Sequence, residues 1–373
     1  MTVLSGAQAS YNRTVGVKLD IDEAIYILPV DDVPLQARIG QEGTNSIKVE
    51  WLEEDLTPQT VTVASATGTD TPWTVTLTDG TSVRVGDVYQ LVDAAYDIQY
   101  LITAIAVGAD VNVVTAASFG GTGATNDPAS PNVWQLVGQY RTEGANPEAA
   151  RSVDRTMPYN YTQWGQEEVK VTRTQQKRAM YGLSDPYGHE VMKKFKELGI
   201  RSEKSMVFGY RTFAGDATKR FMGGLLFYIT DNTESNTKAN SKAAIDALAK
   251  KVYDDGGNPG DCWLMVSPAV KIAISANIDA TLRRTERSDQ TGGYTVERVL
   301  TDFGEISVIV NRHFPKTKGI LLDGKFVKRR PFDRYFHETL AKTGDSESGH
   351  IVGEQSLEVK NQKAHGVLTL TDA

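Results

Sequence analysis

Histidine and cysteine are the first residues to consider, because most metal sites and many covalent mechanisms need them. The chain contains five histidines, His189, His313, His337, His350 and His365. None of them has a cysteine or a second histidine at the spacing of a metal site. The single cysteine, Cys262, lies in the apolar run 262–266, which is typical of a buried side chain. We therefore predict no metal site, no cofactor and no covalent catalysis, and one cysteine excludes an intrachain disulfide framework.

Motifs that bind phosphate or activate a serine are the next candidates. The glycine-rich run 120–124 lacks a following lysine and a following helical pattern, so an ordinary turn is the better interpretation. No Gly-x-Ser-x-Gly motif occurs. The 47 acidic residues form chance pairs, such as those at 53–55 and 254–255, that are typical of solvated ends or helix caps. The sequence predicts that the protein is not an enzyme.

Lysine and arginine form two local clusters, one at Arg173, Lys177 and Arg178 and one within 328–334. Three roles fit such clusters: a subunit contact, surface ion pairing, or contact with a phosphate backbone. The net charge of -7 argues against a dedicated nucleic-acid-binding protein, although not against a local contact. Aromatic residues are not interleaved with the cations as a base-stacking surface requires. A subunit contact or surface ion pairing is the favoured interpretation.

The stretch 159–226 contains the elements that position many of these charges. After a polar, strand-like run, a helix is predicted over 186–210, with a serine or aspartate directly before it as a cap and a proline in its first turn. Apolar residues at spacings of three and four form one narrow stripe. The residues between them form a charged face: Glu190, Lys193, Lys194, Lys196, Glu197, Arg201, Glu203 and Lys204. We predict a strut of about 37 Å, with Phe195 and Leu198 packed on the chain's own sheet and part of the charged face against other subunits.

Residues 60–142 differ from the rest, because they are rich in Thr, Val, Ala and Gly and poor in Lys and Arg. Six short alternating runs separated by turn residues predict a small β-barrel or sandwich. Strand-like runs at 46–51 and 161–174 flank this region and resemble two halves of one hairpin. We interpret 60–142 as a module inserted into that hairpin.

The C-terminal half is α+β. Helices are predicted over 242–253 and 267–276, a buried strand over 263–266, further strands between 305 and 370, and a charged loop over 282–293. No apolar run is long enough to span a membrane, and the N-terminus has no signal-peptide pattern. A flexible arm, a short helix near 19–30, a long hairpin and a strut helix need neighbours to bury their surfaces. The pattern indicates a self-assembling structural subunit.

Several runs resemble the major capsid proteins of a family of tailed bacteriophages. They are Tyr161-Thr162-Gln163-Trp164, Val169-Lys170-Val171-Thr172-Arg173-Thr174-Gln175, Glu203-Lys204-Ser205-Met206-Val207-Phe208-Gly209 and Arg220-Phe221-Met222-Gly223-Gly224-Leu225. The resemblance covers about 19–58 and 143–370, in order. The chain departs from the family in one respect, since about 85 residues replace a short link between Leu56 and Glu143.

The resemblance implies an α+β fold of the Hong Kong 97 type with an inserted small all-β domain. The implied parts are an N-terminal arm at 1–35, an extended loop at 36–58 and 143–180, an inserted barrel or sandwich module at 59–142, a peripheral domain at 181–235 and 306–373 with the spine helix 186–210, and an axial domain at 236–305. The inserted module is expected at the tip of the extended loop, facing outward.

The implied function is the major capsid protein of a tailed double-stranded DNA phage, assembling as pentamers and hexamers of an icosahedral head. Expected partners are further copies of the chain, a scaffolding protein, a portal, a decoration protein and, without sequence preference, packaged DNA, with no membrane contact. The expected location is the virion, and the host cytoplasm during assembly. Candidate interface residues are Trp51, Glu53, Glu54, Arg173, Lys177, Arg178, Lys194, Arg201, Arg283, Arg284, Arg287, Arg329 and Arg330.

Two alternatives remain open at this point. One is an encapsulin-like bacterial compartment shell, which would enclose protein cargo. The other is a β-rich surface-binding protein that uses the 59–142 module and exposes aromatic residues on one face. Its candidate aromatics are Trp73, Tyr89, Tyr96, Tyr100 and Trp134.

Overall fold

The computed structural model describes residues 33–68, 72–91, 99–106, 113–120, 132–146, 152–178, 185–213, 219–277, 298–342 and 344–372. The predicted helix near 19–30 and the charged loop 282–293 lie outside these residues. The chain divides into two compact units, Met1–Trp51 with Met157–Ala373, and Leu52–Thr156. We call the first the main unit and the second the barrel unit, and describe each by itself.

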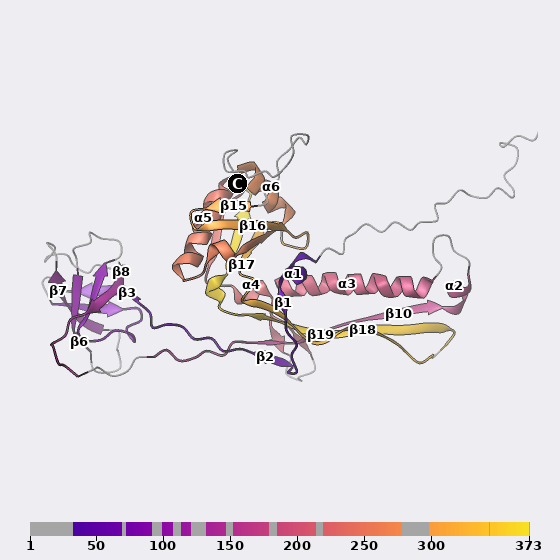
Figure 1. The fold of residues 1–373 in the computed structure, drawn as a ribbon, viewed down its shortest axis with the longest axis horizontal. Coiled ribbons are helices and arrows are strands. Elements are labelled where there is room, and N and C mark those ends of the chain that lie inside the picture. Colours follow the sequence, from indigo (N-terminus) through magenta and orange to yellow (C-terminus); the bar gives the residue numbers. More distant parts are fainter. Residues whose placement is uncertain are drawn as a thin grey trace, which may run out of the picture. The chain divides into compact units, whose positions relative to one another are not determined.

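A four-stranded sheet forms one part of the main unit, in the order β1-β18-β19-β10 (Figure 1). Its members are β1 (Gly40–Gln41), β18 (Val327–Thr339), β19 (Ser346–Val359) and β10 (Gln163–Thr172). Strand β10 pairs with β19 over all ten of its residues, from Gln163 opposite Gln355 to Thr172 opposite Ser346. The sheet is therefore long and narrow, and the helix α3 (Pro186–Phe208) lies along it (Figure 1).

Helix α3 begins and packs as its sequence predicts, but its C-terminal end differs from the prediction. The Asp185 side chain caps it by accepting a hydrogen bond from the Tyr187 N–H at 3.1 Å. Leu198 is buried against the sheet, and Phe195 packs beside it, as predicted. The helix ends at Phe208 and not at residue 210. The next residue, Gly209, has no room for a side chain, because a Cβ atom there would lie only 2.3 Å from the Met222 carbonyl oxygen.

A six-stranded sheet forms the other part of the main unit, in the order β13-β20-β17-β14-β16-β15. Its strands are β13 (Thr233–Thr237), β14 (Trp263–Val266), β15 (Arg298–Thr301), β16 (Gly304–Val310), β17 (Lys318–Leu322) and β20 (Gly366–Thr371). Two helices, α5 (Ser241–Asp254) and α6 (Pro268–Asn277), share a buried apolar core with this sheet. The predicted helices 242–253 and 267–276 and the strand 263–266 are confirmed within a residue or two.

The division of the C-terminal residues differs from the prediction, which placed all of 306–373 with the long helix. Only β18 and β19 join the sheet beneath α3. Strands β16, β17 and β20 instead pair with β14 and β13 in the six-stranded sheet. Strand β14 is buried, so the backbone groups along both of its edges need hydrogen-bond partners. Strands β16 and β17 provide those partners, one on each edge.

Short elements complete the main unit. A hairpin stem consists of β2 (Lys48–Glu50) and β9 (Tyr159–Tyr161), which pair antiparallel. The remaining elements are α1 (Pro34–Arg38), α2 (Arg173–Lys177), α4 (Leu225–Tyr228), β11 (Thr212–Phe213) and β12 (Arg220–Phe221). The predicted strand at 161–174 is thus divided among β9, β10 and the start of α2. The two strands of the stem connect to the barrel unit at Leu52 and Thr156.

The barrel unit contains six strands that close into a barrel, in the order β3-β4-β7-β6-β5-β8. They are β3 (Thr60–Thr67), β4 (Trp73–Leu77), β5 (Asp87–Leu91), β6 (Gln99–Ile105), β7 (Val113–Gly120) and β8 (Asn132–Gln139). Trp73, Tyr89, Tyr100 and Trp134 are all buried in its core, and the last two stack with ring centroids 4.9 Å apart. These four aromatics therefore do not form the exposed face that a surface-binding module requires, and Tyr96 lies outside the described residues.

The sequence also predicts that the chain has no membrane-spanning helix and no metal site. Within the described ranges no helix has both the length and the apolar character needed to cross a membrane. The part of the chain that the structure describes also holds no group of three potential metal-ligating side chains. Cys262 is buried as predicted, and burial raises the pKa of its thiol to about 12, which leaves the sulfur protonated and unreactive at neutral pH.

Candidate assembly surfaces

The N-terminal segment is fastened to α3 by a buried carboxylate. Glu203 accepts hydrogen bonds from the Leu35 N–H at 2.9 Å, the Gln36 N–H at 3.2 Å and the Asn311 amide at 2.7 Å. Helix α1 has no capping side chain at Val33, so Glu203 replaces the missing cap. Burial raises the pKa of Glu203, while the hydrogen bonds that it accepts oppose that rise.

This position corrects the prediction that Glu203 belongs to the charged outer face of α3. Its side chain is fully buried. In the helix it lies beside Ser202 and Met206 at the edge of the apolar stripe, and its partners Leu35, Gln36 and Asn311 all come from segments more than 100 residues away. No local signal in the sequence distinguishes Glu203 from its exposed neighbour Lys204.

The hairpin stem is fastened to the main unit by Asn160, which is fully buried. Its amide nitrogen donates to the carbonyl oxygens of Gly223 at 3.0 Å and Leu357 at 2.7 Å, and its amide oxygen accepts from the Gly223 N–H at 2.8 Å. A Cβ atom on the next residue, Gly224, would approach the Gly209 nitrogen to 2.7 Å. Because Gly223 and Gly224 carry no side chains, the backbone there lies close to the backbone of Gly209, and this brings the stem, β19 and the end of α3 together.

Trp51 and its acidic neighbours lie where the stem meets the barrel unit. Trp51 was a candidate interface residue, but it is buried and packs edge-on against Tyr228 with centroids 5.8 Å apart. Within the barrel unit the backbone of Glu53 pairs with that of Thr156. Glu54 is exposed and forms an ion pair with Arg155 at 2.8 Å.

Lys194 and Arg201, on the charged face of α3, make ion pairs within the chain. Lys194 lies 2.7 Å from Glu197 and 3.8 Å from Glu167 of β10, and the hydrogen bond that it donates to Glu197 raises the pKa of the lysine. Arg201 lies 2.6 Å from the same Glu167. These pairs tie α3 to β10, and Arg201 remains mostly exposed. Their predicted role at a subunit contact stays a prediction.

Arg329 and Arg330 are half-buried, and so less exposed than expected of candidate interface residues. Arg329 donates to the Gln355 side chain at 2.7 Å, and burial lowers the pKa of its guanidinium. Arg330 pairs with the fully buried Glu358 and, at 2.8 Å, with Glu42. Hydrogen bonds from Lys328 and Arg330 lower the pKa of Glu42 to about 2. These cations hold the segment after β1 against β18 and β19, so ion pairing within the chain explains them.

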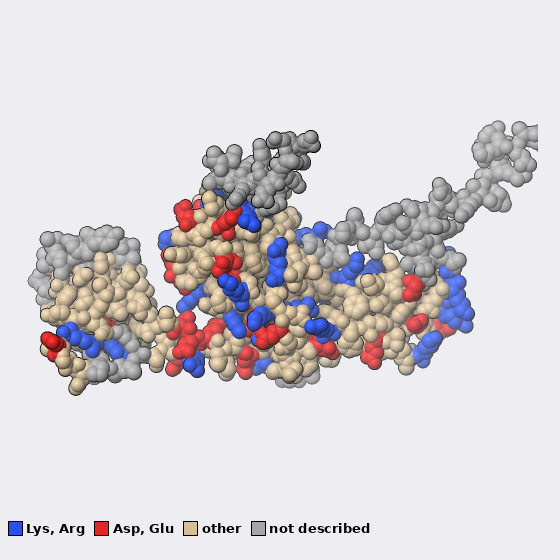
Figure 2. Space-filling view, in the orientation of Figure 1, with Lys and Arg blue, Asp and Glu red and all other residues tan. Residues whose placement is uncertain are grey.

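The other basic cluster lies at one end of the four-stranded sheet. Arg173 pairs with Asp345 at 2.8 Å, and both side chains are exposed. Lys177 and Arg178 are exposed at the end of α2. Figure 2 shows lysine and arginine side chains gathered at the end of the main unit where Figure 1 labels α2. The remaining candidates, Arg283, Arg284 and Arg287, lie outside the described residues.

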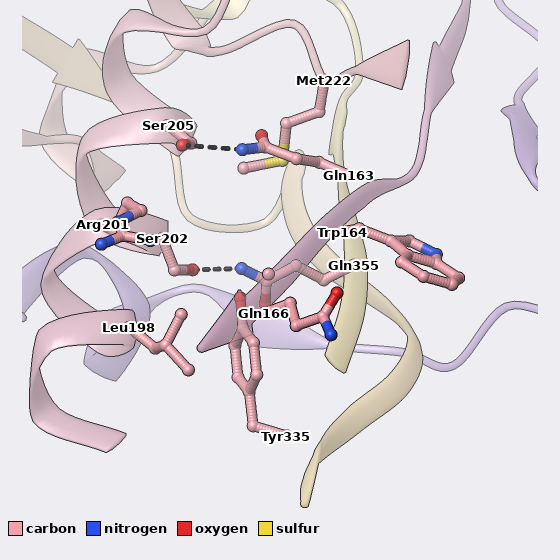
Figure 3. A pocket seen from close by; sticks show the side chains of 11 residues that line it. Gln163, Trp164, Gln166, Leu198, Arg201, Ser202, Ser205, Met222, Tyr335 and Gln355 are labelled. Atoms are coloured by element: carbon pink, nitrogen blue, oxygen red, sulfur yellow. Dashed lines mark hydrogen bonds between the residues drawn. The ribbon is translucent and has the colours of Figure 1, made fainter. Parts of the chain in front are cut away.

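A cavity of about 330 Å³ lies between α3 and the sheet (Figure 3). Amides and hydroxyls from the two sides meet there, since Gln163 donates to Ser205 at 3.2 Å and Gln355 donates to Ser202. Arg201 and Tyr335 also line it. These groups bond to one another across the helix–sheet boundary, so the cavity belongs to the packing between α3 and the sheet.

Comparisons with known proteins support a capsid fold. The chain is similar to the capsid protein of an empty GTA particle, with 10% identity, a TM-score of 0.55, and coverage of 98% of this chain and 100% of that one. It also matches a protein of Mycobacterium phage Bobi, with 9% identity, a TM-score of 0.45, and coverage of 99% and 96%. The encapsulin SrpI from Synechococcus elongatus matches with 14% identity, a TM-score of 0.41, and coverage of 59% and 78%. A search of curated protein sequences found no match.

The long helix on a narrow sheet and the second sheet with its helices thus form a fold that is similar to that of the GTA capsid protein. The chain belongs to the SU10 major capsid protein family, whose model matches residues 5–372. It is a phage major capsid protein, and further copies of the chain are its partners in a shell.

Proposed function

We propose that the chain forms the pentamers and hexamers of an icosahedral head that encloses the double-stranded DNA of a tailed phage. The anchored hairpin stem is the observation that carries this proposal. Asn160 holds the base of the stem with three buried hydrogen bonds, and both strands then connect to a unit with its own core. An extended segment that is fixed at its base but buries little of itself needs the surface of a neighbouring copy.

The Hong Kong 97-type parts are assigned as follows in this proposal. Helix α3 with the sheet β1-β18-β19-β10 is the peripheral domain, and the six-stranded sheet with α5 and α6 is the axial domain. The axial domain then includes β16, β17 and β20 beyond the predicted range 236–305. The hairpin stem is the base of the extended loop, and the barrel unit is an inserted module at its tip.

The charge distribution supports an outward position for the barrel unit. Leu52–Thr156 contains 13 acidic and 4 basic residues, whereas the rest of the chain contains 34 acidic and 36 basic residues. The whole negative excess of the protein therefore lies in this unit. Packaged DNA repels such a charge, so we place the barrel unit outside the shell, where a decoration protein or a host surface is accessible to it.

Electron microscopy of the protein expressed with a scaffolding protein tests the proposal. We expect closed icosahedral shells built of pentamers and hexamers, and dispersed monomers under all conditions would contradict it. Nuclease protection of DNA in particles from infected cells distinguishes a phage head from a compartment shell, which would protect protein cargo instead. A portal at one vertex of those particles is the second expected feature.

A further inference from the structure

The barrel unit contains six aromatic residues that the structure describes, and two of them lie outside its core. The other four are buried at the centre of the barrel. Phe119 and Tyr140 are 39% and 62% exposed, and their rings meet edge to face with centroids 4.9 Å apart. Single exposed apolar side chains are ordinary, whereas two large ones that converge on the surface mark a contact site. We call these two residues the aromatic pair.

The backbone of the barrel brings the two rings together, although they come from strands that do not pair. Strand β7 contains Phe119 and strand β8 ends directly before Tyr140, and each of these strands pairs with others. The register of β6 and β7 makes Phe119 the extra residue of a β-bulge, a feature that turns a side chain from its regular direction. The Tyr140 N–H donates to the Gly86 carbonyl oxygen at 2.8 Å, in a turn where Gly86 has a φ of 87° that favours glycine.

A polar side chain next to the aromatic pair is held in a fixed orientation. Asp87 is fully buried and accepts hydrogen bonds from the Arg84 N–H at 3.1 Å and from the Gln139 amide nitrogen at 3.0 Å. Gln139 directly precedes Tyr140 and is exposed. Because a buried partner holds the amide nitrogen, the amide oxygen is an oriented acceptor for a ligand. An oriented amide beside an aromatic surface is typical of a small-ligand site.

The charges near the aromatic pair favour a neutral ligand. Residues 83–87 and 139–143 contain two cations, Arg84 and Arg141, and two carboxylates, Asp87 and Glu143, so their charges balance. Residues 113–120, around Phe119, contain no charged side chain. Most of the described surface of the barrel unit in Figure 2 is also uncharged. The net negative charge of the whole unit repels polyanions, which argues against nucleic acid and anionic polysaccharide.

The exposed area suits a sugar better than a protein. An aromatic side chain covers about 150–250 Å², so the aromatic pair leaves on the order of 200 Å² accessible. One partner in a standard protein interface contributes about 800 Å². A pyranose ring is similar in size to one aromatic ring, and it has an apolar C–H face with hydroxyl groups around its edge. The C–H face matches an exposed aromatic ring, and the hydroxyl groups match an amide oxygen.

We propose that the aromatic pair and Gln139 form a binding site for neutral polysaccharide. One sugar ring packs on Tyr140, and a hydroxyl of that sugar donates to the Gln139 amide. The role of the site rests on the proposed function, which places the barrel unit outside the shell, where polysaccharide on a host surface reaches it. A single site of this size binds weakly, and the repetition of the site over a shell raises the apparent affinity.

An array of bacterial surface polysaccharides, neutral and anionic, tests the ligand class. The labelled full-length protein is applied both as unassembled subunits and as shells. We expect shells to bind neutral polysaccharides and to bind them more tightly than subunits do, because shells are multivalent. Shells and subunits that bind no neutral polysaccharide, or only anionic ones, overturn the proposal.

Substitutions test the site with subunits and an oligosaccharide of the bound polysaccharide. Tyr140→Ala and Phe119→Ala should each raise the dissociation constant about tenfold in saturation-transfer NMR. Tyr140→Phe, which keeps the ring, should stay within about twofold of the wild type. Val137→Ala is the control, since Val137 is an exposed apolar residue of β8 in the same unit. Proteolysis of the barrel unit checks that each variant is folded, and Tyr140 lies outside the strands, so its removal leaves the core intact.

The outcomes separate the site from the proposed function. Binding that both alanine variants retain places the ligand elsewhere and overturns the site. Subunits that bind neutral polysaccharide but never form shells contradict the proposed function and leave the site in place. Shells that fail to bind a polysaccharide that their subunits bind contradict the outward position of the barrel unit.

Discussion

Replacing Asn160 by alanine should detach the hairpin stem from the main unit. The buried side chain makes four hydrogen bonds, two as a donor and two as an acceptor, since its amide oxygen accepts from the N–H groups of both Gly223 and Tyr161. Alanine removes all four and takes the amide acceptor away from the N–H groups of Gly223 and Tyr161. An unsatisfied buried donor costs about 1–3 kcal/mol and each lost bond about 1 kcal/mol, so the four bonds and the buried Gly223 N–H together give an expected loss of about 5–7 kcal/mol in the free energy of unfolding.

Ser356→Ala is the matched control for this substitution. Ser356 is also buried, and its hydroxyl donates one hydrogen bond to the Tyr161 carbonyl oxygen at 2.9 Å, so it contacts the same stem. Its removal should cost only about 1 kcal/mol. Urea unfolding of the unassembled subunit measures both values.

Hydrogen exchange locates the effect of the Asn160 substitution. We expect faster exchange in β2, β9 and 222–225, with the six-stranded sheet unchanged, because Asn160 bonds to none of that sheet's strands. A loss below about 1 kcal/mol, or faster exchange spread evenly over the main unit, would refute the reasoning that this residue anchors the stem.

Three further predictions concern other parts of the chain. Burial raises the pKa of Glu203 above its ordinary value of 4.5, so the folded state binds the carboxyl proton more tightly than the unfolded state does. The stability that this proton contributes is present below pH 4.5 and is lost as pH rises through the folded-state pKa. Glu203→Gln should remove this part of the pH dependence in urea unfolding, and an unchanged slope would contradict it. Trp134→Ala should destabilise the barrel unit by about 3–5 kcal/mol, whereas Val137→Ala at an exposed position of the same strand should have little effect, as followed by proteolysis of the barrel unit. Deleting 59–142 and joining the hairpin with a short glycine-serine link should leave shell assembly intact under electron microscopy, and complete loss of shells would show that the module is part of the assembly machinery.

Local patterns predicted the elements whose partners are near in sequence. Alternation of apolar and polar residues located the six barrel strands, because alternation is a property of each strand by itself, although only three of the six strand pairs join neighbours in sequence. The cap at Asp185 and the stripe at Phe195 and Leu198 located α3, because capping and helical spacing are properties of one short segment. These features need no knowledge of how distant segments meet.

Two charged residues have partners far away in the sequence that local patterns did not indicate. Glu203 bonds to Leu35, and Arg330 pairs with Glu42. In each case a charged side chain at a suitable surface spacing becomes covered by a segment from the N-terminal region. Charge and spacing describe only the residue itself, so they did not indicate these anchors within the chain, and the predicted interface role of Arg330 stays a prediction.

Both anchors use hydrogen-bonded polar groups where apolar contacts would also give stability. An apolar contact permits small rotations and slides of the docked segment, whereas Glu203 and Asn160 each bond to backbone groups and therefore fix the position and direction of α1 and of the stem strand β9 within the main unit. A shell repeats each subunit contact many times, so an error in that direction would recur at every copy. We infer that the polar anchors hold α1 and the hairpin stem in place before neighbouring copies bind. Asn160→Leu, which keeps the volume and removes the hydrogen bonds, should then impair closure of shells more than it impairs folding, and well-formed shells from this variant would contradict the inference.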